Sequence, residues 1–497
     1  MGQLKQLAKQ TALYGMSSIL GRIINYFLVP LHTSFFKPEE LGVVTNLYGY
    51  VGLIMIIITF GMETAFFRFA SRLKGNQAYS VAATAIMIIS TLMAVLIFLN
   101  AELVASFIPE SGNSPYASQM VRWLAIIVLI DAITAIPFCK LRLDNRPLKF
   151  ASAKLIAIFL NIGLQVFFLI IVPVIHNGEY LSSLSDFTSV IITQDFGIAF
   201  IFMANLIANA LAATLLWKEF IAIRINLNWA VLKPMLIYGF PILIAGLAGW
   251  ISSDLDKTVV ALWASGGQEA QGVYGQTFKI GVLMVLAIQA FRYAAEPFFF
   301  SQSESKTAPK LFAKTLHYFV ILGLILFVAV CTNINLIANI FLRSESYRVA
   351  LFLVPVIMIG KLLNGVYINL SIWFKLKDKT HYGIVFAVVG GVVTLIANFI
   401  LLPIMGYSGS AIAIVLSYLV MCFSCYFVGR RFMPIPYNFR PLLLYLIVAC
   451  GLVSVVFIIP FENYFLEYAY GISAPLSFVI GAYLIERNKL RANVAVD

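Results

Sequence analysis

The sequence predicts an all-α integral membrane protein with fourteen transmembrane helices, arranged as two pseudo-symmetric six-helix lobes followed by two C-terminal helices. Three observations carry this prediction: the composition, the recurrence of long apolar segments, and the distribution of positive charge. The 497 residues are 61% hydrophobic and 11% charged, and the mean hydropathy is +0.93. Soluble domains carry roughly 25% charged residues, so the composition excludes a soluble protein.

Apolar segments recur along the whole chain, each of about 20 residues, the length an α-helix needs to cross the hydrocarbon core. The connections between them are short, so we expect no large soluble domain. We predict spanning helices at residues 11–34, 40–65, 79–100, 119–139, 150–173, 196–217, 234–263, 270–299, 314–333, 349–373, 381–403, 408–429, 441–460 and 465–485.

Lys and Arg residues are concentrated in every second connection between the predicted helices. If the N-terminus is cytoplasmic, most of the 34 Lys and Arg residues fall in inner segments, whereas outer loops carry acids such as Glu39, Glu40 and Glu102. Because cytoplasmic loops carry an excess of Lys and Arg, this pattern predicts an even number of spans with both termini cytoplasmic. It also accounts for the formal net charge of +12 without nucleic acid as a partner.

Two segments suggest an internal repeat. Residues 40–69 can be aligned with residues 270–299. In this alignment Gly42 corresponds to Gly272 and Asn46 to Gln276. Six helices separate the two segments, so both copies would have the same orientation in the membrane. Parallel repeats of this kind are a known transporter plan, with the substrate path between the halves. The predicted division is residues 1–217 for helices 1 to 6, 218–429 for helices 7 to 12, and 430–497 for helices 13 and 14 with the tail.

Several cations lie inside predicted spans. Arg22 and Asn25 share one face of the first helix, and Arg22 lies about 16 Å into the membrane at 1.5 Å per residue. A charge at that depth costs at least about 2.5–3.5 kcal/mol, so Arg22 should face a watery cavity or a partner. It is interpreted either as a cation for an anionic substrate or as an ion pair with a buried acid such as Asp131. The predicted substrate-binding residues are Arg22, Asn25, Lys279, Lys361 and Asn364.

The acids inside spans suggest ion coupling or gating. Asp131 lies in the middle of the fourth helix, where a buried carboxyl group can exchange protons near neutral pH; a buried pair with a cation is the alternative. Asp254, Asp256 and Lys257 lie toward the outer end of the seventh helix. We predict these four residues to act in ion coupling or gating, with a hydrated interfacial position as the alternative for the last three.

No catalytic or metal-binding pattern is present. The sequence contains no H-E-x-x-H, P-loop or G-x-S-x-G motif, so we expect neither an enzyme nor a cofactor. Cys422 and Cys425 have C-x-x-C spacing, but they lie in an apolar helix without His or acidic neighbours. We therefore expect them to serve in packing rather than in redox or zinc chemistry.

Four segments carry a resemblance to a known family: LKQLAKQTALYG, FFKPEELGVVTNLYGYV, GMETAFFRFAS and SSDLDKTVVALWASGGQEAQGVYGQTFKIG. With them the chain resembles the polysaccharide-transporter branch of the superfamily of multidrug, oligosaccharidyl-lipid and polysaccharide exporters, over essentially its whole length. The resemblance implies two lobes around a central cavity that opens alternately to either side. It also implies a substrate class, the undecaprenyl-pyrophosphate-linked sugars that such proteins move to the outer leaflet.

The same resemblance suggests roles for particular residues. Related lipid II flippases use cavity arginines on helices 1 and 8, and Arg22 matches the first in kind. Helix 8 instead offers Lys279, which lacks the bidentate geometry with which arginine binds pyrophosphate. Helices 13 and 14 form a lipid-tail groove in some relatives.

We therefore expect a flippase of the bacterial cytoplasmic (inner) membrane that serves O-antigen, capsule or exopolysaccharide assembly. Its expected partners are the lipid-linked oligosaccharide, membrane lipids, H⁺ or Na⁺ as a coupling ion, and polysaccharide polymerase machinery. One alternative is an ion-coupled multidrug or cation antiporter of the same superfamily, which would favour a cavity dominated by acids. The other is a membrane polysaccharide polymerase, ligase or glycosyltransferase, which usually needs a substantial outer loop or a soluble domain.

Overall fold

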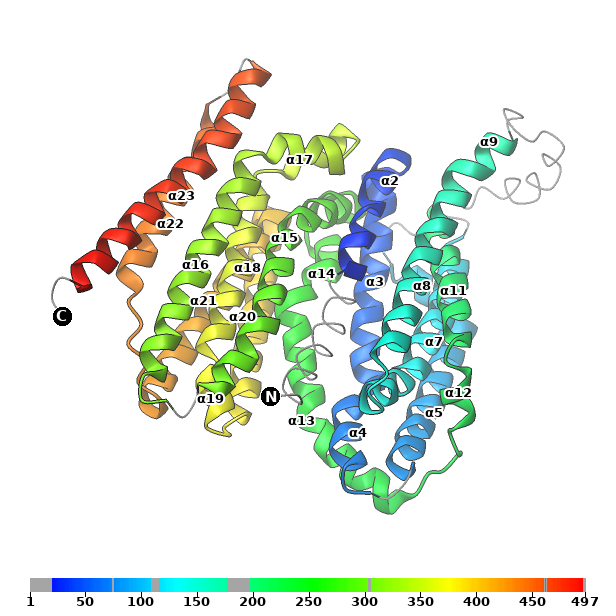
Figure 1. Ribbon diagram of the computed structural model, residues 1–497. Coiled ribbons are helices and arrows are strands. Elements are labelled where there is room, and N and C mark those ends of the chain that lie inside the picture. The colour runs from blue at the N-terminus through cyan, green and yellow to red at the C-terminus, as the bar shows by residue number, and fades with distance from the viewer. Residues whose placement is uncertain are drawn as a thin grey trace. The chain divides into compact units, whose positions relative to one another are not determined.

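The computed structural model describes residues 20–73, 76–108, 116–176, 197–302, 305–459, 461 and 463–494, and its regular elements in these ranges are all helices. The chain divides into two compact units, Met1–Gly272 and Val273–Asp497. The elements of both units are labelled in Figure 1. The predicted all-α fold is confirmed.

Twelve described helical segments are long and apolar enough to cross a membrane. A further predicted span corresponds to α11 (Ala199–Thr214), which is apolar but has only 16 residues. The first predicted span, residues 11–34, lies partly outside the described residues. Its described part is helical at residues 20–26 and again in α2 (Leu28–Phe35). The chain is thus a multi-pass membrane protein.

The described part of the unit Met1–Gly272 consists of helices that follow one another along the chain. After α2 come α3 (Pro38–Thr59), α4 (Met62–Ala70), α5 (Gln77–Leu99), α6 (Ala101–Ser106), α7 (Ala117–Leu143), α8 (Pro147–Val166), the π-helical segment η2 (Phe167–Ile171), α9 (Val172–His176), α11, α12 (Trp217–Ile221), α13 (Trp229–Asp254), α14 (Asp256–Trp263) and the first turns of α15 (Gly267–Ser301). Helices α3 and α8 each begin with a proline in the first turn, where its missing N–H costs no hydrogen bond.

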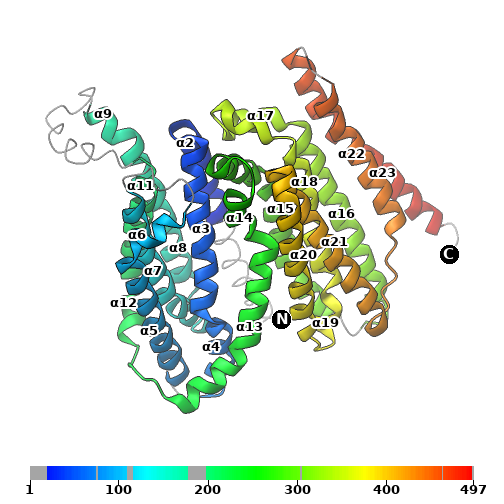
Figure 2. The same cartoon turned by 180° about the vertical axis from the view of Figure 1, so that it is seen from behind.

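The predicted helix at residues 40–65 is interrupted, so that α3 and α4 are separate elements. Phe60 and Gly61 have φ values of 47° and 69°, a left-handed conformation that ends an α-helix. Helix α13 packs closely at this break: a Cβ atom on Gly239 would lie 2.4 Å from the carbonyl oxygen of Phe60. Figure 2 shows α13 running beside α3 and α4, in agreement with the contacts between these helices.

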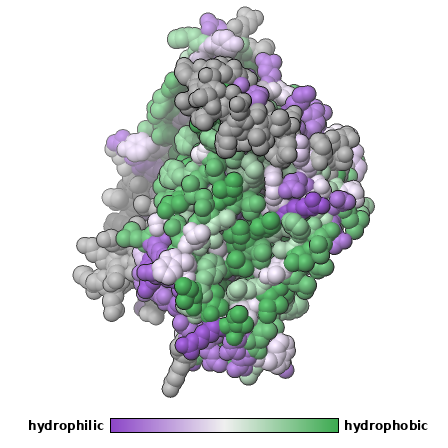
Figure 3. Space-filling view, turned by 90° about the vertical axis from the view of Figure 1, so that its right-hand side faces the viewer, coloured by the Kyte–Doolittle hydropathy of each residue, from purple (hydrophilic) through white to green (hydrophobic). Residues whose placement is uncertain are grey.

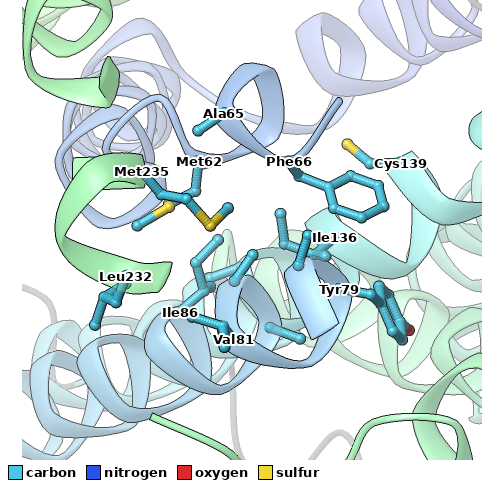
Figure 4. Close-up of a cluster of buried hydrophobic side chains, with 14 of the residues drawn as sticks. Met62, Ala65, Phe66, Tyr79, Val81, Ile86, Ile136, Cys139, Leu232 and Met235 are labelled. Atoms are coloured by element: carbon cyan, nitrogen blue, oxygen red, sulfur yellow. The ribbon is translucent and has the colours of Figure 1, made fainter. Parts of the chain in front are cut away.

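A cluster of buried apolar side chains holds the lower ends of these helices together. Met62 and Phe66 from α4 meet Ile86 from α5, Ile136 from α7 and Met235 from α13, as Figure 4 shows. All five are almost fully buried. Helix α13 therefore belongs to the core of Met1–Gly272, although we expected it to begin the second lobe. The lobe boundaries at 217 and 429 stay a prediction.

The unit Val273–Asp497 is also helical. It contains the remainder of α15, α16 (Ala308–Thr332), α17 (Ile334–Phe341), the 3₁₀ segment η4 (Glu345–Ala350), α18 (Leu353–Leu370), α19 (Ile372–Leu376), α20 (His381–Met405), α21 (Tyr407–Phe432), α22 (Phe439–Ile458) and α23 (Tyr464–Val494). Helices α22 and α23 pack on α16, where Tyr445 and His317 both hydrogen-bond Glu486, at 2.9 and 3.0 Å. The two C-terminal helices are thereby attached to the rest of this unit.

Many large apolar side chains are exposed on the outer faces of the helices, including Leu99, Phe399 and Ile447. Apolar residues cover much of the face seen in Figure 3, and hydrophilic residues gather at its lower end. Exposed apolar surface of this extent is unfavourable in water, and it suits contact with lipid chains.

Candidate functional site

The charged residues predicted on the seventh helix lie at its interruption. Helix α13 ends at Asp254, and α14 begins at Asp256. The ammonium of Lys257 forms an ion pair with the carboxylate of Asp254, and the Ser253 hydroxyl donates a hydrogen bond to the same carboxylate. The side chains of Lys257 and Asp254 are 35% and 33% exposed, so the pair is open on one side. Asp256 is buried, and its carboxylate accepts a hydrogen bond of 3.0 Å from the backbone N–H of Lys257.

Helix α3 holds this cluster in place from the other side. The Asn46 amide donates a hydrogen bond of 3.0 Å to the backbone carbonyl of Thr258. One turn further along α3, a Cβ atom on Gly49 would lie 2.7 Å from the Thr258 side chain and 3.2 Å from Cβ of Lys257. Because glycine leaves that space empty, α14 can approach α3 closely enough to fix the position of Lys257.

Arg22 lies in the helical residues 20–26, with its neighbour Gly21 packed against Ile158 of α8. The side chains of Arg22 and Asn25 are exposed. Arg22 lies in the same unit, Met1–Gly272, as the cluster of Asp254 and Lys257.

The predicted cations of the second unit lie where α15 meets α18. Lys361 is buried, and its ammonium lies 4.6 Å from the centre of the Phe278 ring, a cation–π distance. Lys279 is half-buried, and its ammonium donates a hydrogen bond of 2.9 Å to the Gln276 side chain. Asn364 is half-buried on α18, three residues beyond Lys361. The structure thus brings Lys361 and Lys279 to one helix contact.

Asp131 belongs to a third group, inside Met1–Gly272. The Asn209 amide donates hydrogen bonds of 3.0 Å to Asp131 and of 3.0 Å to Asn205, and Asn205 donates one of 2.8 Å to the Tyr48 hydroxyl. These four residues link α7, α11 and α3 in one polar chain. Lys154 is the cation whose charge acts on Asp131. The structure shows no pairing of Asp131 with Arg22 in the part of the chain that it describes, although that pairing was one interpretation of Arg22.

Sequence reasoning missed the partners of Asp131. Asn205 and Asn209 are polar residues spaced by four in the otherwise apolar helix α11, so they share one helix face. This spacing is the signal that would have found them. Tyr48 gave no comparable signal, because tyrosine is common in membrane helices.

Three further ion pairs join the helix ends that the charge pattern predicts to be cytoplasmic. Glu63 at the start of α4 accepts a hydrogen bond of 3.1 Å from Arg142. Glu219 in α12 is buried, and it lies 2.5 Å from the Lys149 ammonium and 3.7 Å from the Arg146 guanidinium. These pairs connect neighbouring helices, and we interpret them as structural.

The comparisons with known proteins agree with this architecture. Residues 33–180 match the model of a family described as polysaccharide biosynthesis protein. No curated protein matches the chain in sequence.

Solved structures are similar over most of the chain. A structure titled as the lipid II flippase MurJ in an inward closed conformation has a TM-score of 0.74 and 14% identity, and the match covers 96% of this chain and 99% of that one. An inward-facing multidrug resistance MATE family transporter of the MOP superfamily has a TM-score of 0.62 and 17% identity, with 85% and 94% covered. A MOP superfamily transporter from Pyrococcus furiosus has a TM-score of 0.56 and 17% identity, with 87% and 97% covered.

The fold therefore defines a class of architecture, that of multi-pass membrane proteins folded like these transporters. Within that class, the chain has the fold of MurJ and of the MATE transporters of the MOP superfamily. Together with the match to the polysaccharide biosynthesis family over residues 33–180, this confirms the resemblance to the polysaccharide and multidrug exporter superfamily.

Proposed function

We propose that this protein is a flippase that moves an undecaprenyl-pyrophosphate-linked oligosaccharide across the bacterial cytoplasmic membrane by alternating access. The observation that carries the proposal is the likeness to a lipid II flippase over 96% of the chain. The match of residues 33–180 to a polysaccharide biosynthesis family supports an oligosaccharide as the cargo, for O-antigen, capsule or exopolysaccharide assembly.

The basic residues within the helices support an anionic substrate. A pyrophosphate carries negative charge that must be compensated inside the membrane, because an isolated charge there is costly. Arg22 supplies a planar guanidinium suited to phosphate oxygens, and Lys279 and Lys361 supply point charges. Asn25 and Asn364 add amide donors on the same helix faces. In this mechanism the prenyl tail stays in lipid while these groups hold the diphosphate.

The polar chain from Asp131 to Tyr48 supports coupling to an ion gradient. It joins three helices of Met1–Gly272 through hydrogen bonds of 2.8 to 3.0 Å. Gain or loss of a proton or Na⁺ at Asp131 would change these bonds and so the packing of α7 against α11. The ion pair of Lys257 with Asp254 would act as a gate that opens and closes during transport.

A cation antiporter of the same superfamily is the second candidate, and the half-buried Asp131 together with the likeness to a MATE transporter favours it. The two functions differ in the charge of the substrate.

We expect both termini to be cytoplasmic, the lobes to follow residues 1–217 and 218–429, and polysaccharide polymerase machinery to receive the product.

The experiment that separates the two functions uses the full-length protein in proteoliposomes. One set of vesicles contains a fluorescent undecaprenyl-pyrophosphate-linked sugar, whose exposure is followed by chemical quenching from outside. Another set tests uptake of a cationic dye under a pH or Na⁺ gradient. We expect protein-dependent flipping of the lipid-linked sugar and no dye transport. Dye transport without flipping would replace the flippase with the antiporter.

A further inference from the structure

An apolar crevice of about 390 Å³ lies within the unit Met1–Gly272, between α3, α5, α6 and α7. These four helices are labelled in Figure 2. Side chains from all of them line it, and the lining includes Val51, Ile54, Met93, Ile97, Phe107 and Leu124. None of the predicted substrate-binding or gating residues contributes to it.

The lining excludes water, ions and sugars as stable occupants. Among the described lining residues, the Tyr50 hydroxyl is the one polar side-chain group, whereas a buried water needs two to four polar partners. A site of this volume with apolar walls is suited to a hydrocarbon ligand. The molecule that enters it should therefore present an aliphatic chain without polar groups.

At the position of the crevice in the membrane, the aliphatic chains available are those of the surrounding lipids. Its lining residues on α3, α5 and α7 lie within three of the membrane-spanning segments, in the half of the membrane that the charge pattern predicts to be outer. Phe107 at its rim is 73% exposed, and Leu103 beside it is 57% exposed. The crevice thus continues into the apolar surface that contacts lipid, and acyl chains surround its opening.

The geometry of α3 separates the crevice from the charged cluster. At 100° per residue, Asn46 and Gly49 point to one side of the helix, where they contact Thr258 and Lys257 of α14. Val51 and Ile54 point to a different side, on average about 140° further around the helix, where they line the crevice. A substrate whose headgroup binds near Lys257 would have α3 between that headgroup and the crevice. The crevice is therefore poorly placed for the tail of that substrate.

We propose that the crevice is a binding site for one acyl chain of a phospholipid from the outer leaflet. The bound chain fills the space that α3, α5, α6 and α7 enclose. It packs against α3 on a different side of that helix from the side that contacts α14. The lipid would act as a structural ligand of the first unit, separate from the transported substrate, and the proposal does not depend on the proposed function.

Photo-crosslinking of the full-length protein in vesicles tests this proposal. The probe is a phosphatidylglycerol with a diazirine in the middle of one acyl chain, and adducts are mapped by mass spectrometry. We expect adducts on Met93, Ile97 and Leu124 to exceed those on the lipid-facing residues Leu92 and Leu96. Equal labelling of both sets would mean contact with bulk lipid only, and would overturn the proposal.

Two neighbouring residues of α5 give a matched pair of variants. Met93→Trp should fill the crevice and remove the adducts on Leu124, whereas Leu92→Trp should leave them unchanged, because Leu92 faces lipid. Ala125→Leu fills the crevice from α7 and should have the same effect as Met93→Trp. Persistence of the Leu124 adducts in both filled variants would contradict the proposal.

The source of the chain is tested by competition. Undecaprenyl phosphate, added to the same vesicles at a low mole fraction, should leave the adducts in place. Their loss would identify a prenyl chain as the preferred occupant and would overturn the assignment to a phospholipid.

Discussion

Gly42 and Gly272 lie against each other where α3 crosses the first turns of α15, because a Cβ atom on Gly272 would lie 3.0 Å from the backbone nitrogen of Gly42. The contact is reciprocal. A Cβ on Gly42 would lie 1.9 Å from the carbonyl oxygen of Gln268, and one on Gly272 would lie 1.8 Å from that of Pro38. The alignment that sets Gly42 on Gly272 also sets Pro38 on Gln268, so each copy makes the same contact with the other.

We predict that Gly42→Ala destabilises the protein. The added methyl group meets backbone atoms, which cannot rotate away as a side chain can, so the cost should reach about 1–3 kcal/mol or more. The measurement is thermal unfolding of the purified protein in detergent. Gly249→Ala is the matched control, because its Cβ meets nothing within 4 Å, and it should be neutral or stabilising by up to about 1 kcal/mol. Equal effects of the two variants would contradict the close approach of α3 and α15.

We predict that Glu219→Ala is strongly destabilising. Glu219 is 4% exposed and lies beside Lys149 and Arg146, so its removal leaves two cations without their partner. Breaking a buried pair in this way costs about 3–5 kcal/mol, and the partial exposure of Lys149 places the expectation at the lower end. Glu102→Ala is the control, since Glu102 is 83% exposed in its pair with Arg122. Its cost should not exceed about 1 kcal/mol, and a comparable loss in both variants would refute the structural role of Glu219.

We predict that Asp131→Asn uncouples transport from the ion gradient. The variant retains an amide that can hydrogen-bond Asn209, but it can no longer bind or release a proton or Na⁺ as a carboxylate does. Flipping should proceed without a gradient and should no longer accelerate when one is imposed. Asn209→Ala keeps the carboxylate but removes the hydrogen bond that joins Asp131 to α11, so it should weaken the response without abolishing ion binding at Asp131. A wild-type response in Asp131→Asn would remove Asp131 from ion coupling.

We predict that the ion pair of Asp254 with Lys257 contributes to transport as a pair. Asp254→Asn and Lys257→Met should each slow flipping, and the exchanged variant with both Asp254→Lys and Lys257→Asp should recover part of the rate. Because both side chains are about one-third exposed, the coupling energy in the double-mutant cycle should be about 0.5–1 kcal/mol. Strict additivity of the two single effects would show that the contact plays no part in gating.

The helices could be predicted well from the sequence because each membrane span is a long segment of high hydropathy. It did not predict the break at Phe60 and Gly61, since a single left-handed residue pair does not change the apolar character of the segment. It also did not predict that α13 packs into the core with Met62 and Phe66. Packing partners depend on side-chain shape, and one apolar helix face resembles another.

The residue types and the membrane depth of the candidate site stay predictions from the sequence, and the sequence could not give the grouping of these side chains. Hydropathy gives the depth of Arg22, Lys257 and Lys361, whereas the side to which each points depends on helix rotation. The structure pairs Lys257 with Asp254, places Lys361 against Phe278, and joins Asp131 to Asn209. The spacing of four between Asn205 and Asn209 in α11 indicates that they share one helix face, so this part of the grouping could have been predicted.

The flipping rate of the Arg22→Ala variant tests the central claim most directly. The measurement is the initial rate at which reconstituted protein exposes a fluorescent undecaprenyl-pyrophosphate-linked sugar, with Arg122→Ala as a control at an exposed arginine. We expect Arg22→Ala to lose at least about tenfold in rate, the effect of one charge-assisted contact to phosphate, Arg22→Lys to lose less, and Arg122→Ala to match the wild type. Wild-type flipping by Arg22→Ala, or no flipping by the wild-type protein itself, would contradict the proposed mechanism.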